Sequence, residues 1–270
     1  MPAEATRDPA VQRLYEKAKQ LGTWDPAAID LSRDVEHWRG LTSDERDFLF
    51  RVASLFFTAE EAVTRDLLPV AFLAAKERRL DDELFVTAWL WEEGKHADFF
   101  RRFLDDVVGG EFVRRPQDVV SEQQLFDVEL AGDMQRLLED SSPPAQARAF
   151  TTYCLLLEGV LADSGQRVLE DALKARGLLP GLQQALVLVN RDESRHVAYG
   201  LHVLTRLMGV DPGVAGVVRA RVEELTPLVR QVADGIVVRY AEQPFGVSYA
   251  LREPIQRLVA QLERLSPAAG

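Results

Sequence analysis

Apolar side chains recur at helical spacing along nearly the whole chain, whereas alternating strand patterns are almost absent. Thr42 and Glu45 stand three residues apart ahead of an apolar run, as in a capping box. We therefore predict a helix that begins after Thr42 and runs to about Leu67, where Pro69 bends or ends it.

Clusters of glycine, proline and serine separate the later helical patterns from one another. These patterns predict further helices over residues 81–108, 117–138, 144–175, 181–208, 214–240 and 248–265. The chain shows no internal repeat, no low-complexity linker and no change of composition. We expect one all-α domain over residues 1–270, built as a bundle of long helices.

Composition and charge exclude several classes of function. With 43 acidic against 32 basic residues and a net charge of −11, the chain has no basic stripe for nucleic acid. Its longest uncharged stretch, residues 177–190, is too short and too polar to span a bilayer. There is no secretory signal pattern, and Cys154 alone cannot form an intramolecular disulfide or a thiolate-rich metal site. We expect a cytoplasmic protein.

Two copies of Glu-x-x-His carry the strongest chemical signal. Glu93 with His96, and Glu193 with His196, each lie three residues apart inside a predicted helix and therefore share a helical face. A single such pair is common on solvated helices. Here two of the chain's four histidines occupy the motif, which favours metal binding.

A dinuclear site of this type also needs one glutamate from each of two other helices. Glu158 lies in a long apolar run and Glu60 follows another, so each would be costly to bury unless it is paired or bound to metal. Glu61 is expected to face solvent. Four carboxylates neutralise two divalent ions, and mixed carboxylate and imidazole ligands suit iron or manganese.

The order Glu, Glu-x-x-His, Glu, Glu-x-x-His resembles the ribonucleotide reductase small-subunit superfamily, from about residue 24 to residue 196. The resemblance implies a ferritin-like four-helix core with additional helices. It also implies a hydrogen-bonded chain from Trp24 through Asp192 to the ligand His96, although Trp24 as a plain packing residue is the simpler alternative.

The chain departs from a reductase subunit in three ways. Phe100 stands four residues after His96, where the resemblance implies a radical-bearing tyrosine. Glu60 replaces a common aspartate, and the C-terminal residues 262–267 contain no tyrosine to relay a radical. A radical-generating reductase subunit is therefore an alternative, and an iron-storage or other metal-binding bundle is a second.

The chain looks more like the ligand-binding oxidases related to that subunit. It has Val63 three residues after Glu60 and Tyr153 five residues before Glu158, as those oxidases do. The resemblance implies an ether bond between the Tyr153 phenol oxygen and the Val63 β-carbon, made by the metal centre with dioxygen. It also implies a long-chain fatty acid at a heterodinuclear manganese/iron centre.

Spacing alone does not pair Tyr153 with Val63. Residues five apart lie about 140° apart around an ideal α-helix, so Tyr153 must lean inward or the helix must carry a π-bulge to join Glu158. Without the resemblance, core packing would explain both side chains.

We therefore predict an oxidoreductase that activates dioxygen for two-electron oxidation and assembles as a homodimer. Manganese is expected at Glu60, Glu93 and His96, and iron at Glu158, Glu193 and His196. The ligand types do not tell the two metals apart.

Overall fold

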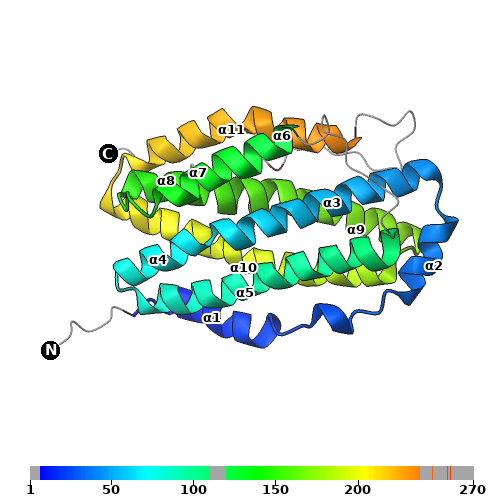
Figure 1. Ribbon diagram of the computed structural model, residues 1–270. Coiled ribbons are helices and arrows are strands. Elements are labelled where there is room, and N and C mark those ends of the chain that lie inside the picture. The colour runs from blue at the N-terminus through cyan, green and yellow to red at the C-terminus, as the bar shows by residue number, and fades with distance from the viewer. Residues whose placement is uncertain (1–6, 110–119, 238–244, 246–253, 255, 257–270) are drawn as a thin grey trace.

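The structure is a computed structural model that describes residues 7–109, 120–237, 245, 254 and 256 (Figure 1). Every regular element in these ranges is helical, so the all-α prediction is confirmed. The α-helices are α1 (Pro9–Leu21), α2 (Ser32–Gly40), α3 (Ser43–Asp66), α4 (Leu68–Lys76), α5 (Leu80–Phe103), α6 (Val120–Gln123), α7 (Ala131–Arg136), α8 (Pro143–Phe150), α9 (Asp163–Arg176), α10 (Pro180–Val210) and α11 (Val214–Val237). A short 3₁₀ turn, η1 (Pro26–Ala28), and three π-helical segments, η2 (Leu104–Val108), η4 (Gln124–Leu130) and η5 (Thr151–Ala162), complete them.

The predicted start and stop signals lie where the helices begin and end. The Thr42 hydroxyl accepts from the Glu45 amide and the Glu45 carboxylate accepts from the Thr42 amide, which forms the capping box of α3. Pro69 lies in the first turn of α4 and separates it from α3. Gly109 has φ +76°, the left-handed conformation that glycine adopts without strain, and it ends η2.

Several predicted boundaries differ from the structure or lie outside it. Helices α1 and α2 precede the first helix that the pattern delimited. The predicted helix over 144–175 is helical throughout, but its middle is the π-helical η5. The predicted helix over 248–265, the start of the helix over 117–138 and the end of the helix over 214–240 lie outside the described residues.

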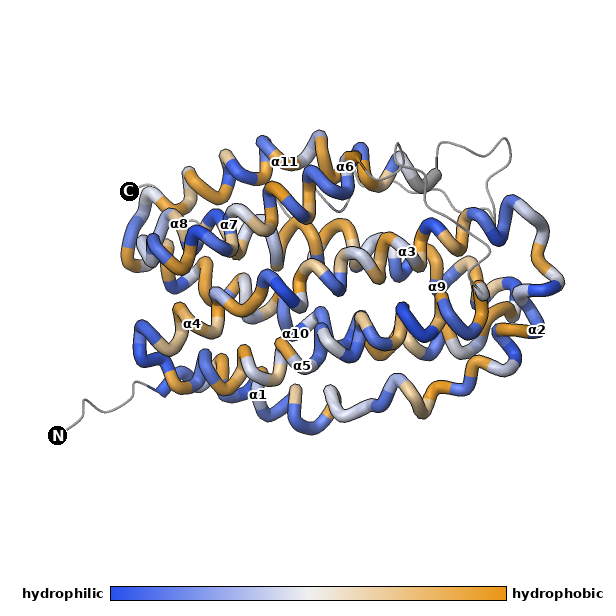
Figure 2. Tube along the Cα trace, viewed as in Figure 1, coloured by the Kyte–Doolittle hydropathy of each residue, from blue (hydrophilic) through white to orange (hydrophobic). Residues whose placement is uncertain are grey.

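The core lies between four helical columns. Helix α3 packs along α5, and η5 packs along α10, while α1 covers α5 and α11 covers η5. Figure 2 shows hydrophobic and hydrophilic positions interspersed along α1, α3, α5, α10 and α11, as amphipathic helices require. In η5, by contrast, ten of the twelve residues are buried. Trp89, Phe99, Phe100 and Leu156 are completely buried between the columns.

One close contact sets the spacing between η5 and α10. A Cβ atom added at Gly200 would lie 2.3 Å from the Cβ of Cys154. Only glycine permits this approach, so Gly200 lets η5 lie against the helix that carries Glu193 and His196.

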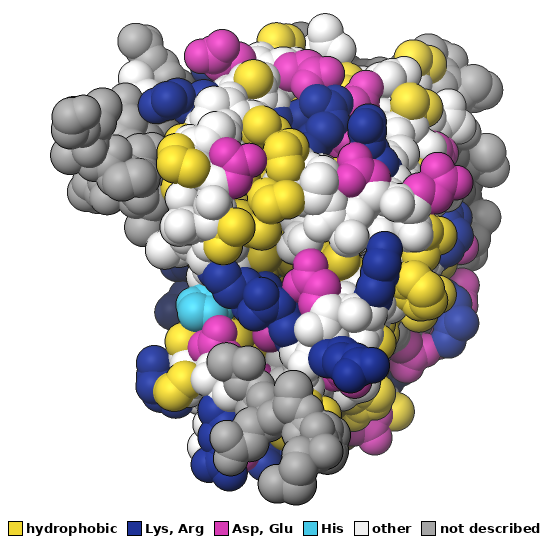
Figure 3. All heavy atoms as spheres, turned by 90° about the vertical axis from the view of Figure 1, so that its left-hand side faces the viewer, with side chains coloured by type: hydrophobic (Ala, Val, Ile, Leu, Met, Phe, Trp, Pro, Cys, Tyr) yellow, Lys and Arg dark blue, Asp and Glu magenta, His cyan; other side chains and the backbone are white. Residues whose placement is uncertain are grey.

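The outer surface is mixed in character. Figure 3 shows the end of the bundle near α4, where acidic, basic and hydrophobic side chains are interspersed. In the part of the chain that the structure describes, no helix is long and apolar enough to cross a membrane.

Candidate metal centre

The fold brings all six predicted ligands to the middle of the bundle. Each is at most 5% exposed. Glu60 comes from α3, Glu93 and His96 from α5, Glu158 from η5, and Glu193 and His196 from α10.

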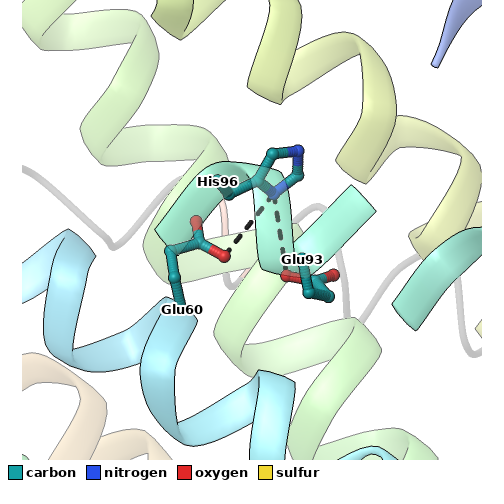
Figure 4. Close-up of side chains that lie close together, drawn as sticks. All are labelled: Glu60, Glu93 and His96. Atoms are coloured by element: carbon teal, nitrogen blue, oxygen red, sulfur yellow. Dashed lines mark ion pairs between the residues drawn. The ribbon is translucent and has the colours of Figure 1, made fainter. Parts of the chain in front are cut away.

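Glu60, Glu93 and His96 form one group of possible metal ligands. The Nδ1 atom of His96 lies 3.5 Å from Glu60 Oε2 and 3.6 Å from Glu93 Oε2. Figure 4 shows the imidazole nitrogen facing both carboxylates. The three side chains converge from α3 and α5 on one point.

Glu93, Glu158 and His196 form a second group. The Nδ1 atom of His196 lies 3.0 Å from Glu93 Oε1 and 3.1 Å from Glu158 Oε1. Glu93 therefore belongs to both groups, with one carboxylate oxygen turned to each histidine. This shared position could not be read from the spacing of the motifs.

Glu193 is not part of either group. The Gln166 amide nitrogen donates to both of its carboxylate oxygens, at 2.8 and 2.9 Å. Gln166 lies on α9 and is 1% exposed. Sequence reasoning missed this residue, and a polar side chain on the inner face of a helix was the only signal.

The donor atoms fit metal ions. In the described part of the chain, the buried His96 Nδ1 and Glu158 Oε2 have no hydrogen-bond partner. Buried polar atoms are rarely left in this state. Two imidazole nitrogens and four carboxylates match the ligands that iron and manganese accept.

The pKa shifts of the predicted ligands also indicate a site for metal ions. Burial raises the pKa of Glu60 to about 8 and that of Glu158 to about 7, and it holds the pKa of Glu193 well above its usual value. Burial alone would lower the pKa of His96 and His196, but the surrounding carboxylates outweigh it and raise both. Without metal, protons must supply the positive charge that these carboxylates require.

The outer nitrogen of His96 faces a second set of residues. Its Nε2 atom lies 3.4 Å from Asp192 Oδ2, and the Trp24 indole N–H donates to the same oxygen at 2.7 Å. Trp24 also stacks on the His96 ring, with centroids 6.0 Å apart. The three side chains thus lie in the order that the resemblance implied.

An apolar cavity of about 760 Å³, including its mouth, borders the carboxylates of both groups. Val63 and Tyr153 both line it. Hydrophobic residues make up most of the remaining wall, among them Phe48, Val52, Leu55, Phe56, Phe126, Leu157, Leu161 and Leu169.

Tyr153 points into the centre because of the π-helical backbone. Hydrogen bonds in a π-helix join residues five apart, so Tyr153 and Glu158 lie on one face of η5. The Tyr153 hydroxyl donates to Glu93 Oε1 at 2.9 Å. The sequence left two options open for Tyr153, an inward-leaning side chain or a π-bulge. The structure has π-helical backbone at this point.

Trp89 is a further residue at the centre that sequence reasoning missed. Its indole N–H donates to Glu93 Oε1 at 2.7 Å, and its ring stacks on Tyr153 and His196. The signal was its position four residues before Glu93 on the same helix. Phe100, by contrast, is a core residue that stacks on Phe56.

Comparison with known proteins agrees with this geometry. The family described as ribonucleotide reductase, small chain, matches residues 4–226. The chain belongs to this family.

Within this family, the chain is similar to two solved structures of R2-like ligand-binding oxidases. One is a variant of an R2-like ligand-binding oxidase with an aerobically reconstituted Fe/Fe cofactor, which is 32% identical in sequence. The match covers 97% of this chain and 94% of the oxidase chain, with a TM-score of 0.89. Another variant has an aerobically reconstituted Mn/Fe cofactor and is also 32% identical. That match covers 97% of this chain and 95% of the oxidase chain, with a TM-score of 0.89.

These findings confirm three predictions made from the sequence. The resemblance to ligand-binding oxidases is confirmed, and so are the ferritin-like all-α fold and the oxidoreductase class. The family match also covers the region from residue 24 to residue 196 on which the resemblance rested.

Proposed function

We propose that this protein is a manganese/iron oxidase that activates dioxygen for two-electron oxidation. The observation that carries the proposal is the pair of buried histidine–carboxylate groups that share Glu93 beside an apolar cavity. The relatives with Mn/Fe and Fe/Fe cofactors support the choice of metals.

The residues would divide between two metal positions. Glu60, Glu93 and His96 would hold manganese, while Glu158, Glu193 and His196 would hold iron. Glu93 faces both histidines, so its carboxylate could contribute an oxygen to each position. Glu193 would have to leave Gln166 or bind while Gln166 still donates to it.

When bound, the metal pair would supply the oxidising power of the reaction with dioxygen. The protein's part is to present the groups that are oxidised. We propose that the Tyr153 oxygen bonds to the β-carbon of Val63. The O–H and C–H bonds break, and the two protons and two electrons released are taken up by dioxygen. Both side chains line one cavity, and Glu93 lies within reach of the phenol proton.

A long-chain fatty acid is the proposed occupant of the cavity. It opens beside the predicted metal ligands, and its wall is apolar except at the carboxylates, as is usual for ligand sites. An acyl chain would pack against that wall while the acid group reaches the metals. Organic extraction of the purified protein should therefore release fatty acid in about equimolar amount, and lipid-free protein would contradict this part.

The test of the oxidase proposal is metal loading of the full-length chain. Protein supplied with Mn(II) and Fe(II) without oxygen should bind one ion of each, placed by anomalous scattering, and should consume dioxygen when air is admitted. One metal ion per chain, or none, would contradict the dinuclear centre. Two ions without oxygen consumption would contradict the oxidase.

A cytoplasmic location and a homodimer remain predictions for this protein. Size-exclusion chromatography with light scattering should give twice the 30.3 kDa chain mass. A large shell would favour the storage alternative.

A further inference from the structure

The outer nitrogen of His196 faces an acid that sequence reasoning did not single out. Glu92 Oε2 lies 2.8 Å from His196 Nε2. Glu92 is completely buried on α5, next to Glu93. Its position relative to His196 matches that of Asp192 relative to His96.

A single guanidinium joins the two acids. Arg195 Nη2 donates to Glu92 Oε1 at 2.5 Å and to Asp192 Oδ1 at 2.6 Å. Lys95 donates to Asp192 Oδ2 at 3.0 Å. Arg195 is 4% exposed and Lys95 is 6% exposed, so two acids and two bases form a buried bridge with no net charge.

The N-terminal segment closes this bridge from outside. Lys95 donates to the Gly22 carbonyl oxygen at 2.6 Å. A Cβ atom at Gly22 would lie only 2.0 Å from Glu92 Oε1, so the backbone approaches the acid as closely as glycine allows. The bridge is therefore shielded from water.

We propose that Glu92, held by Arg195, is a positioning residue that fixes the tautomer and the orientation of His196 for metal binding. The inference rests on the proposed dinuclear centre and adds the outer partner of its second histidine. A carboxylate that accepts the Nε2 proton leaves the Nδ1 lone pair facing Glu93 and Glu158.

The Glu92→Gln variant tests this role because Arg195 can only donate hydrogen bonds. The amide oxygen must then face Arg195, which turns the amide N–H₂ toward His196. His196 Nε2 becomes an acceptor, and its proton moves to Nδ1, where the metal should bind. We expect metal affinity at the His196 position to fall about 10- to 100-fold, with the His96 position unchanged.

A second substitution should reverse the loss. In Glu92→Gln/Arg195→Met, no guanidinium dictates the orientation of the amide, so its oxygen can accept from His196 Nε2. We expect the double variant to bind metal at this position about tenfold more tightly than the single variant. A merely structural role for the bridge predicts the opposite, because the double variant removes more of it.

Metal titration with calorimetry and anomalous scattering would follow each position, after unfolding curves show that each variant folds. Exposed Glu61→Gln is the matched control and should bind as wild type. If Glu92→Gln does not fold, Glu92→Asp replaces it. The shorter side chain of that variant cannot reach both partners at once, so it should weaken the His196 position alone.

Unchanged affinity in the Glu92 variants, or weaker binding in the double variant than in the single one, would overturn the inference. Failure of the dinuclear centre itself is distinguishable, because wild-type protein would then not bind two metal ions.

Discussion

Each proposed metal position has one nitrogen ligand, so neither histidine has a substitute within its group. Removal of an imidazole leaves buried carboxylates without the donor that completes the position. We expect His96→Ala and His196→Ala each to lose tight binding at their own position and to keep the other. Elemental analysis with anomalous maps would check this, and near-full occupancy of both positions would show that the site is placed wrongly.

The pair Tyr153 and Val63 makes the sharpest prediction for a single bond. Protein loaded with reduced manganese and iron and then exposed to air should become lighter by two hydrogen atoms, since each partner loses one. Tandem mass spectra should place the link between the peptides that contain residues 63 and 153. Unlinked peptides from fully loaded, air-exposed protein would contradict the ether bond but not the metal centre.

Tyr153→Phe is the control for that experiment. The phenylalanine ring keeps the stacking on Trp89 but has no oxygen to form the bond. This variant should load both metals and consume dioxygen while its mass stays that of the metal-free chain.

Among the helical elements, η5 shows how side chains support an unusual backbone. The Thr151 hydroxyl donates to the Ala147 carbonyl at 2.6 Å, and the Thr152 hydroxyl donates to Asp133 at 2.6 Å. Arg221 from α11 donates to Thr152 at 2.9 Å. These hydrogen bonds stabilise the backbone where α8 ends and η5 begins, two residues before Tyr153.

The packing of η5 on α10 gives a stability prediction. Gly200→Ala would place a Cβ atom 2.3 Å from the Cβ of Cys154, so the two elements must separate. We expect a loss of about 1–3 kcal/mol in the free energy of unfolding. Chemical denaturation would measure it.

Gly132→Ala on α7 is the matched control. An added Cβ atom there has no neighbour within 4 Å, and alanine favours a helix over glycine. This variant should gain up to about 1 kcal/mol. Equal effects of the two substitutions would contradict the packing argument.

For the whole molecule, the metals should be part of what holds the bundle together. Burial raises the pKa of Glu60 to about 8 and that of Glu158 to about 7 in the metal-free state. A carboxyl whose folded-state pKa is raised loses its contribution to stability as the pH rises through that value. Bound metal ions would take the place of these protons. Because the assembled site exists only in the folded chain, the ions would stabilise the folded state over the unfolded one.

We therefore expect the unfolding temperature of chelator-treated protein to fall from about pH 5 to about pH 8, between the usual pKa of a glutamate and the raised values, while that of metal-loaded protein changes less. Thermal unfolding of both forms across this range would check the prediction. A gap between the two forms that is independent of pH would contradict it.

Much of this protein was predictable from local patterns. The capping box of α3, the stop at Gly109 and the exposure of Glu61 follow from residues close together in the chain. The burial of Glu60 and Glu158 follows from the apolar runs around them. Local signals suffice where neighbours within a few turns decide the structure.

Tertiary structure alone decided how these residues meet. The sharing of Glu93, the pairing of Glu193 with Gln166 and the place of Glu92 behind His196 all depend on contacts between separate helices. Helical periodicity fixes which face a residue occupies, but not the depth, rotation or π-helical register of its neighbours. The sequence by itself therefore determined the long helices from α3 onward and the candidate ligands, while packing decided which oxygen faces which nitrogen.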